Sequence, residues 1–458
     1  MTQRFVVIGG DAGGMSAAAQ ARRRSRDASD LEIVAFERSR FTSYSACGLP
    51  YFVAGTVDEA DDLIARTPTE HAAMGVDVRV GHEVVRIDAA ARTVAVQNLA
   101  AGAERIEPFD QLLIATGAVP IRPDLPGVNS DGVHGIQNMA DGIALRAHLD
   151  EHHDDHHRAV VVGGGYVGLE MAESMHQRGL PVTVVDSGEQ PMSTLDPEIG
   201  ARVADAMRAL GIDVRMQTRA TAFETDTGDH VRAVSTSEGT IDADVVVLGI
   251  GVRPNVQLAH DAGIALGPTG AIATDDRMQT SVAGVWAAGD CVEVTHRVTG
   301  KKAYVPLGTH ANKQGRVVGV NVTGGDAHFR GVVGTAVTKI CAYEIGRTGL
   351  SEREAKEAGF EVATATIETT TRAAYFPGAQ PITVKVVAER PAGRLLGAQV
   401  FGREGAAKRV DIAAVAIWAG LAVDEIGQLD LGYAPPFSPL WDPVLVAANQ
   451  AARELALL

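Results

Sequence analysis

Residues 159–168 have the sequence AVVVGGGYVG, in which an apolar run meets a cluster of glycines. The apolar run predicts a short buried strand, and the glycines predict a tight turn that opens a helix. The next predicted strand, residues 182–185, ends at Asp186, about 20 residues after the turn. Together these features complete the G-x-G-x-x-G fingerprint of a dinucleotide-binding βαβ unit, whose glycines here are Gly163, Gly165 and Gly168.

Asp186 predicts which nucleotide this unit prefers. An acid at this position binds the 2′-hydroxyl of a ribose and repels a 2′-phosphate. No Lys or Arg stands between Ser187 and Asp196 to accept that phosphate. NADH is therefore favoured over NADPH, although a basic residue supplied by another part of the fold would also admit NADPH.

A second unit of this kind lies earlier in the chain. Residues 5–37 contain an apolar strand, the turn GGDAGG at residues 9–14, a helical stretch and a second strand that ends at Glu37. Asp11 stands where the second glycine of the pattern is expected, so turn chemistry alone stays open as the alternative. The residues expected against a nucleotide here are Gly9, Gly13, Gly14 and Glu37.

Later segments continue the α/β pattern, and the pattern of predicted strands and helices then changes. Apolar strands end in Ala115-Thr116-Gly117, at Gly251 and in Gly289-Asp290, and a helical stretch opens near residues 307–310 with the sequence LGTH. We expect His310 there to be a structural helix-start residue, with a flavin contact as the alternative. From about residue 329, strand-like runs alternate without a Gly-rich turn and precede a long predicted helix, residues 405–421, which indicates a separate α+β domain.

Bulk composition restricts the classes of partner. The formal net charge of −16 and the isoelectric point near 5.3 argue against a nucleic acid or an anionic membrane as partner. Three widely spaced cysteines do not form a disulfide framework, which favours a cytoplasmic location. The strand-like residues 5–8 leave no room for a signal peptide, and the longest apolar stretch, residues 412–423, is too short to span a bilayer.

Residues 43–51, SYSACGLPY, predict a loop that turns into a helix with Pro50 in its first turn. Cys47 would then lie at the helix N-terminus, where unpaired amides and the helix dipole favour an anion. Cysteines so placed can have a pKa lowered from about 8.5 to roughly 3.5–7.5, which produces a nucleophilic thiolate. A small buried core residue is the alternative for a lone cysteine.

A histidine-dense segment precedes the strand at residue 159. Metal binding is conceivable from the spacing of its histidines, but a solvated linker fits the neighbouring acids better, so we predict no metal. The histidines are His152, His153, His156 and His157.

The two βαβ units, the strands ending in Ala115-Thr116-Gly117 and Gly289-Asp290, and the α+β tail resemble the flavin-dependent pyridine nucleotide–disulfide oxidoreductases over essentially the whole chain. Within that family, residues 43–51 resemble the coenzyme A-disulfide reductases and their NADH oxidase and persulfide reductase relatives. Thr42 lies five positions before Cys47, so the paired cysteines of the glutathione- and lipoamide-type members are absent. Peroxidase and water-forming oxidase relatives carry a histidine in the first Gly-rich loop, where this chain has Ala12, which weakens an interpretation as peroxide chemistry.

The resemblance implies an α/β fold with two Rossmann-like three-layer (ββα) dinucleotide-binding domains and a C-terminal α+β dimerisation domain. We expect an FAD-binding domain in two parts, residues 1–118 and 252–328, an NAD(P)H-binding domain at 119–251, and the dimerisation domain at 329–458. FAD would contact the first turn, Glu37 and three later groups: Ala115, Thr116 and Gly117; Gly289 and Asp290; and Gly308 and Thr309. NADH would contact the second turn, Asp186 and Gly251, with Tyr166 as a gate over the flavin and Glu170 orienting the nicotinamide amide.

The resemblance also implies the thiol substrate and a partner subunit. Gln20, Arg23 and Ser43 match residues that bind coenzyme A, which can be carried as a mixed disulfide on Cys47. Tyr375 and Tyr433 match paired active-site tyrosines that the partner supplies in a homodimer with shared sites; a buried tyrosine packed on proline is the alternative for each. Ala46 replaces a usual asparagine, which leaves the identity of the disulfide open.

The sequence therefore predicts reduction of coenzyme A disulfide, or a related low-molecular-weight disulfide, through Cys47 with FAD and NAD(P)H. NADH oxidase or persulfide/polysulfide reductase activity is the alternative within the family, and a non-catalytic nucleotide-sensing flavoprotein is the alternative from another class. Cys291 and Cys341 are expected to be packing residues, although Cys291 directly follows Asp290 and a place near the flavin stays open for it.

Overall fold

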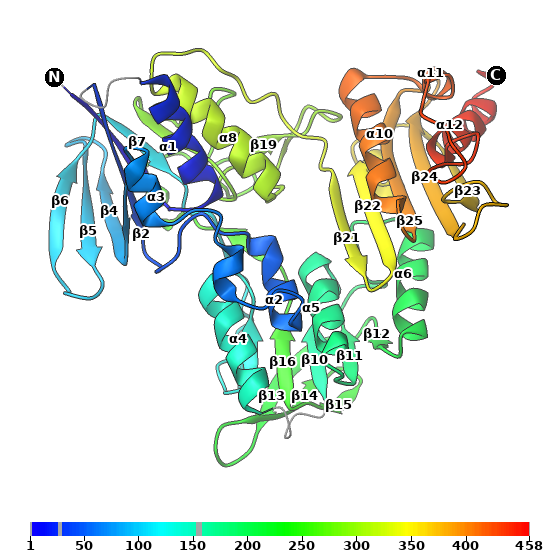
Figure 1. Ribbon diagram of the computed structural model, residues 1–458, viewed down its shortest axis with the longest axis horizontal. Coiled ribbons are helices and arrows are strands. Elements are labelled where there is room, and N and C mark those ends of the chain that lie inside the picture. Colours follow the sequence, from blue (N-terminus) through cyan, green and yellow to red (C-terminus); the bar gives the residue numbers. More distant parts are fainter. Residues whose placement is uncertain (1, 26–29, 153–157, 458) are drawn as a thin grey trace.

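The computed structural model describes residues 2–25, 30–152 and 158–457. The chain forms three lobes, each built around its own sheet (Figure 1). The lobe with the N-terminus lies at upper left, a second lobe containing α4 and α5 lies at the bottom, and the C-terminal sheet lies at right. The short helix α2 lies where the first and second lobes meet, beside α4 and α5.

The first lobe contains a five-stranded sheet in the order β18-β7-β1-β2-β3, with every neighbouring pair parallel. Residues 285–287 thus join the same sheet as residues 3–8, while the exact domain boundaries stay a prediction. Its strands are β1 (Gln3–Ile8), β2 (Leu31–Glu37), β3 (Asp77–Val80), β7 (Gln111–Ile114) and β18 (Val285–Ala287).

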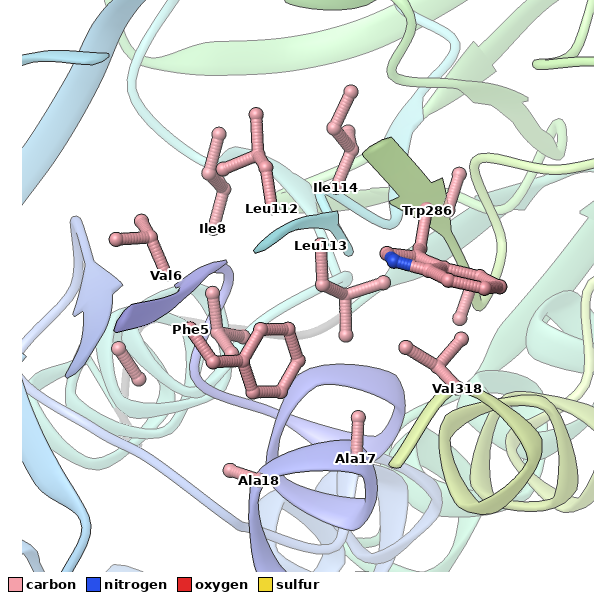
Figure 2. Packing of buried hydrophobic residues seen from close by; sticks show 14 of the residues in the cluster. Phe5, Val6, Ile8, Ala17, Ala18, Leu112, Leu113, Ile114, Trp286 and Val318 are labelled. Atoms are coloured by element: carbon pink, nitrogen blue, oxygen red, sulfur yellow. The ribbon is translucent and has the colours of Figure 1, made fainter. Parts of the chain in front are cut away.

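Burial of this sheet on both faces explains its continuous apolar runs. Phe5 and Val6 on β1 and residues 112–114 on β7 are fully buried (Figure 2). Ala17 on α1 (Ala12–Arg24) and Val318 on α8 (Gly308–Asn321) belong to the same apolar cluster. The strands predicted from these runs are confirmed.

Helices α1 and α8 cross very closely, and two glycines of α8 permit this. A Cβ atom at Gly315 would lie 2.2 Å from the carbonyl oxygen of Gly13, and one at Gly319 would lie 2.5 Å from that of Ala17. Any side chain at these positions forces the helices apart. The crossing brings residues about 300 positions apart into one layer, as the 2.6 Å hydrogen bond from Ser16 Oγ to Asn312 Oδ1 shows.

The second lobe repeats the parallel arrangement in the order β12-β11-β10-β16-β9. Its strands are β9 (Val133–Gly135), β10 (Ala159–Val162), β11 (Val182–Val185), β12 (Asp213–Arg215) and β16 (Val245–Leu248), with helices α4 (Met139–Glu151), α5 (Tyr166–Gln177) and α6 (Pro197–Ala209).

Each of these two lobes also carries a three-stranded antiparallel sheet, which supplies the third layer of the expected ββα architecture. These sheets are β4 (His82–Asp88), β5 (Thr93–Asn98) and β6 (Glu104–Pro108) in the first lobe, and β13 (Ala220–Thr225), β14 (Val231–Thr236) and β15 (Gly239–Asp242) in the second. Smaller pairs are β8 (Ala118–Pro120) with β17 (Val252–Pro254), and β19 (Val294–Thr295) with β20 (Lys302–Ala303).

The C-terminal lobe is an antiparallel sheet in the order β21-β22-β25-β24-β23, packed against α10 and α12. Its strands are β21 (Ala336–Ile340), β22 (Tyr343–Gly349), β23 (Val362–Thr370), β24 (Pro381–Glu389) and β25 (Leu395–Gly402). The remaining helices are α2 (Leu49–Ala54), α3 (Pro68–Ala73), α7 (Gln257–Asp261), α9 (Glu352–Glu357), α10 (Ala406–Ala419), α11 (Val423–Ile426) and α12 (Pro443–Glu454), and the 3₁₀ turns are η1 (Ala46–Gly48) and η2 (Ala60–Leu63).

The α/β fold and the separate α+β tail predicted from the sequence are confirmed, and the predicted helix at residues 405–421 corresponds to α10. Within the described part of the chain, no helix combines the length and apolar character needed to cross a membrane.

Gly319→Val tests the close helix crossing. A valine side chain would overlap the backbone of Ala17, so we expect the free energy of unfolding to fall by about 1–3 kcal/mol. Thermal denaturation of the purified protein measures this as a lower midpoint. Gly135→Ala is the matched control, because nothing lies within 4 Å of a Cβ atom there; equal midpoints for the two variants would contradict the packing argument.

Candidate active site

The two Gly-rich turns have the same geometry. Gly9 and Gly163 open them with φ values of +106° and +110°, a left-handed region that only glycine adopts without strain. A Cβ atom at Gly14 would lie 2.0 Å from the carbonyl oxygen of Gly9, and one at Gly168 would lie 1.9 Å from that of Gly163. The first and last glycines of both fingerprints are therefore required by the backbone itself.

The acid at the end of the second strand of each unit is fixed against its turn. The Gly10 amide donates to Glu37 Oε2 at 2.8 Å, and the Gly164 amide donates to Asp186 Oδ2 at 2.6 Å. A second amide, that of Gly188, donates to Asp186 Oδ1 at 2.6 Å. These bonds hold both carboxylates at the turn, as ribose binding requires.

The substitution of Asp11 for the second glycine does not disturb the first turn. Asp11 has φ −120°, which any residue adopts, and Gly165 at the matching place has φ −79°. Burial, and next the nearby Glu37 carboxylate, raise the pKa of Asp11 to about 6. The first fingerprint is therefore structurally complete despite its departure from the pattern.

Helices α1, α5 and α8 are among the helices whose N-terminal amides have no side-chain cap. The residues before α1, α5 and α8 make no side-chain hydrogen bond to the helix, whereas α3, α4, α9 and α12 are capped by Thr67, Asn138, Ser351 and Asp442. Free amides at a helix start attract phosphate and other anionic groups. α1 and α5 follow the two Gly-rich turns, and α8 begins at Gly308 and Thr309, which are both exposed.

The strand ends of the first lobe gather beside these amides. The Gly289 amide donates to Gln314 Oε1 on α8 at 2.7 Å, and burial raises the pKa of the adjacent Asp290 to about 6. Thr116 Oγ1 donates to the carbonyl oxygen of Asn255 at 2.6 Å, which ties residues 115–117 to the chain just beyond Gly251. The predicted FAD residues of the first lobe thus lie at the carboxyl edge of one sheet, where open α/β sheets bind ligands.

Cys47 lies in η1, directly before α2, and its thiol is free and exposed. The carbonyl groups of α2 are held by the second lobe: Ser174 Oγ donates to Pro50 O at 2.7 Å, and Arg146 donates to Phe52 O at 2.6 Å. Arg178 donates to Val53 O at 3.1 Å. The helix predicted after Cys47 is confirmed, and it is docked on the nucleotide unit formed by α4 and α5.

The loop before Cys47 is held by the first lobe instead. The Ser43 amide donates to the carbonyl oxygen of Gly10 at 3.0 Å, within the first Gly-rich turn. Ser43 itself adopts φ +51°, a strained value for a residue other than glycine. Cys47 therefore lies between the two nucleotide-binding units: the loop before it is bonded to the first, and the helix after it is bonded to the second.

The expected low pKa of Cys47 is wrong. Although the residue is exposed, partial loss of hydration raises the pKa of its thiol, and the carboxylates of Glu170, Asp290 and Asp11 raise it further. A single 3₁₀ turn followed by a six-residue helix has too small a dipole to offset these negative charges. Because the carboxylates of Glu170 and Asp290 act electrostatically on the Cys47 thiol, Cys47 lies near one predicted nicotinamide residue, Glu170, and one predicted flavin residue, Asp290.

His71 contacts a predicted substrate residue, and sequence reasoning did not single it out. Its Nε2 lies 2.9 Å from the hydroxyl of Ser43, and its ring is buried, which lowers its pKa and keeps it neutral. His71 belongs to the short helix α3, and no motif marks it. Its contact fixes the side chain of a predicted substrate residue.

The other two predicted substrate residues share one face of α1. Arg23 donates to Gln20 Oε1 at 3.3 Å, and Arg23 is exposed. Across the α1–α8 crossing lie the exposed Asn312 and Arg316 of α8. Sequence reasoning missed both, because only the tertiary crossing places them beside α1. Among the described residues, no hydrogen bond joins Gln20 or Arg23 to Ser43.

Tyr375 and Tyr433 lie in the C-terminal lobe with 77% and 46% of their surface exposed. A hydrogen bond with Tyr433 raises the pKa of Tyr375, so the two hydroxyls are neighbours. The alternative of tyrosines buried against proline is therefore wrong. Within the described part of one chain, no interaction joins either tyrosine to Cys47.

The remaining singled-out residues have structural surroundings. Cys291 is fully buried and its thiol contacts the carbonyl oxygens of Ala288 and Ile114, so it packs in the core. His310 is buried and Nδ1 lies 3.1 Å from Val305 O, as expected for a helix-start residue. The ring of His152 lies tilted beside that of His148, with 4.9 Å between the ring centres, and residues 153–157 lie outside the described residues. The described ranges contain no group of three or more metal-ligating side chains.

The chain is similar to known proteins over nearly its whole length. A family model described as "Pyridine nucleotide-disulphide oxidoreductase" matches residues 3–315, and the model of its dimerisation domain matches residues 335–443. The "NAD(P)H coenzyme A polysulfide/persulfide reductase" of Pyrococcus horikoshii is 38% identical over 451 residues, or 98% of each chain. A "Coenzyme A disulfide reductase" of Staphylococcus haemolyticus is 29% identical over 439 residues, or 95% of this chain and 96% of the relative.

A solved structure agrees with these matches. The crystal structure of "reduced Bacillus anthracis CoADR-RHD" superposes with a TM-score of 0.95 at 34% sequence identity. It covers 100% of this chain and 81% of that chain. The fold is therefore shared along the full length described here.

Glu170→Gln tests the electrostatic surroundings of Cys47. Removing this carboxylate takes away a negative charge that opposes the thiolate, so we expect the pKa of Cys47 to fall relative to the natural protein. The rate of alkylation by iodoacetamide as a function of pH measures this value, with Cys47→Ser as the blank. Glu238→Gln, at an exposed turn residue, is the control; an identical pH profile for Glu170→Gln and Glu238→Gln would contradict the arrangement.

Proposed function

The chain belongs to the pyridine nucleotide-disulphide oxidoreductases, and from this premise we propose that it uses NADH and FAD to reduce coenzyme A disulfide, or a related low-molecular-weight disulfide, through Cys47. One observation carries the proposal above the others. A single exposed thiol is anchored to both nucleotide-binding units, with the predicted nicotinamide residue Glu170 and the predicted flavin residue Asp290 close enough to shift its pKa.

The first lobe fits FAD. Its Gly-rich turn admits no Cβ atom at either end, Glu37 is held for a ribose, and the uncapped amides of α1 and α8 suit a pyrophosphate and an electron-rich ring. Gly289, Asp290 and residues 115–117 would complete the contacts along the sheet edge. FAD would supply the electron relay between a nicotinamide and a sulfur.

The second lobe would bind the nicotinamide nucleotide. Gly163, Gly165 and Gly168 line the turn, and Asp186, which accepts hydrogen bonds from two amides, would meet the adenosine ribose and favour NADH. Glu170, at the second turn of α5, would accept a hydrogen bond from the nicotinamide amide. Tyr166, half-buried at the start of α5, would act as the gate over the flavin, and Gly251 would border the nucleotide.

The chemistry at Cys47 is thiol–disulfide exchange. The Cys47 thiolate attacks one sulfur of the incoming disulfide, the S–S bond breaks, and one thiolate leaves while the other half stays bonded to Cys47. An electron pair from NADH and two protons then release the second thiol and restore Cys47. The net reaction converts one disulfide, one NADH and one proton into two thiols and NAD⁺.

The partner sulfur must come from outside the chain. Thr42, at the place of a second redox cysteine, is buried and donates to the carbonyl oxygen of Gly10. Cys291 is buried in the core of the first lobe, and none of the three cysteines forms a disulfide. Cys47 therefore exchanges with a diffusible molecule.

A phosphate-bearing thiol suits the surface of the α1–α8 crossing. The protein carries a net charge of −16, yet the α1–α8 crossing presents Arg23, Arg24, Lys313 and Arg316 as exposed side chains. Concentrated positive charge on an acidic protein favours an anionic ligand. With Gln20 and Ser43, these residues would bind the phosphates and the pantetheine arm of coenzyme A, which can remain bonded to Cys47 between turnovers.

A homodimer would complete the site. Tyr375 and Tyr433 are exposed in the lobe that the dimerisation model matches, near the large exposed side chains of Phe437, Leu440 and Trp441. Apolar surface of this kind marks a protein–protein interface. The tyrosines of the partner subunit would donate protons to the departing thiolate.

Persulfide or polysulfide reduction is the second candidate. It is favoured by the similarity to the Pyrococcus horikoshii relative over almost the whole of both chains, and by Ala46, which departs from the asparagine of the coenzyme A-disulfide reductases. It would use the same exchange at Cys47, with a longer sulfur chain as the acceptor.

Steady-state NADH oxidation with three acceptors tests the proposal. We expect turnover with coenzyme A disulfide, abolished in Cys47→Ser, because the exchange needs that sulfur. Electron transfer from NADH to ferricyanide should survive in Cys47→Ser, and Cys341→Ser is the matched control that keeps full activity. Turnover with polysulfide or oxygen alone would select the alternative reactions, and disulfide turnover that survives in Cys47→Ser would refute the proposal.

Mixed dimers test the shared site. We co-express Cys47→Ser chains with Tyr375→Phe/Tyr433→Phe chains; each homodimer is expected to be nearly inactive. If the tyrosines act across the interface, random pairing restores about a quarter of the natural sites, because one site in each mixed dimer has both intact halves. Absence of any recovery would mean that the tyrosines act within their own chain, whereas full activity of the Tyr375→Phe/Tyr433→Phe homodimer would mean that the reaction does not need them.

A further inference from the structure

Two neighbouring residues of the C-terminal lobe contact the helix that carries the predicted nicotinamide residue. Thr338 Oγ1, on β21, donates to Glu170 Oε1 at 3.0 Å. The next residue, Lys339, places Nζ 3.0 Å from Glu173 Oε1. Glu170 and Glu173 are one turn apart on α5, so one short strand segment contacts both carboxylates.

The surroundings make these contacts electrostatically important. Thr338 is buried and the Glu173 side chain is only 4% exposed, so the hydrogen bond to Glu170 and the carboxylate of Glu173 are largely shielded from water, while the Lys339 side chain is 41% exposed. Gln177 Nε2 also donates to Glu173 Oε1 at 2.8 Å. Glu173 is thus neutralised by Lys339, whereas Glu170 has no cation of its own among the described residues and depends on Thr338 for its hydrogen bond.

The same strand also reaches the redox cysteine's motif. Lys339 Nζ lies 5.9 Å from the centre of the Tyr51 ring, four residues after Cys47. Ser174, on the next turn of α5, bonds Pro50 of α2. Strand β21, helix α5 and the Cys47 helix therefore meet at one point.

We propose that Thr338 and Lys339 are positioning residues of the C-terminal lobe that hold the Glu170 carboxylate as the acceptor for the nicotinamide amide. The proposal rests on the proposed function, because that function gives Glu170 its ligand. Thr338 occupies Oε1, and no hydrogen bond from another described residue reaches Oε2, which leaves that oxygen available to the ligand.

The ionisation of Glu170 follows from the groups that face it. These are Tyr166 and Glu173 on α5, Thr338 and Lys339 on β21, and Cys47 and Tyr51 on the redox segment. Burial raises the pKa of Glu170, and Glu173 raises it further, whereas the hydrogen bond from Thr338 lowers it. Loss of Thr338 therefore moves the pKa upward, and the carboxylate is lost at a higher pH.

Binding of NAD⁺ to the FAD-loaded enzyme, measured by calorimetry from pH 5 to pH 8, tests the proposal. We expect Thr338→Val to weaken binding by about five- to tenfold, as loss of a typical net hydrogen bond does. The fall in affinity at low pH should also begin at a higher pH in this variant. Thr338→Ser, which keeps the hydroxyl, should restore both properties.

Two further variants complete the design. Thr366→Val, at an exposed position of β23, is the matched control and should bind as the natural protein does. Lys339→Met leaves Glu173 without its ammonium partner, so it should shift the pH dependence in the same direction as Thr338→Val, and it serves as the test if Thr338→Val does not fold. Thr338→Val or Lys339→Met profiles that match Thr366→Val at every pH would overturn the proposal. Failure of the natural protein to bind NAD⁺ would instead overturn the proposed function.

Discussion

The docking of the six-residue helix α2 onto the second lobe is the constraint on which the rest of the site depends. A helix this short is not stable alone, so its position is set by its contacts. Three of its carbonyl groups accept hydrogen bonds from Ser174, Arg146 and Arg178, while Leu49, Phe52 and Val53 join the apolar core of the second lobe. The preceding loop is bonded to the first Gly-rich turn. One cysteine thus belongs to both nucleotide-binding units, and any change in their relative position moves its sulfur.

The charges around this sulfur suit a disulfide more than a free thiolate. Loss of hydration raises the pKa of Cys47, and the carboxylates of Glu170, Asp290 and Asp11 raise it further. Burial raises the pKa of Asp11 and of Asp290 to about 6. A mixed disulfide carries no charge on its sulfurs, so these carboxylates do not oppose it. The acidic surroundings therefore agree with the proposed mixed disulfide on Cys47, as does a sequence with no second redox cysteine beside it.

The local sequence pattern was sufficient to predict the fold, but it was not sufficient to predict the contacts within the candidate active site. The parallel strands, both Gly-rich turns and the helix after Cys47 follow from apolar runs and glycine positions, and the structure confirms them. The contacts that tune the site join residues 28 to 296 positions apart, such as Ser43 with His71, Thr338 with Glu170, and Ser16 with Asn312. The expected pKa of Cys47 was wrong for the same reason, because the packing that removes water from its thiol and the carboxylates that oppose its thiolate come from distant segments. The antiparallel third layers had no glycine signature and were predicted only through the family resemblance.

The central claim is that Cys47 forms its disulfide with a diffusible thiol. The most direct measurement is the intact mass of the protein, denatured without reductant after exposure to coenzyme A disulfide. The account predicts one added coenzyme A moiety per chain, removed by reductant and absent from Cys47→Ser. A chain that turns over the disulfide yet never carries the adduct, or that shows a bond between two of its own cysteines, would contradict it.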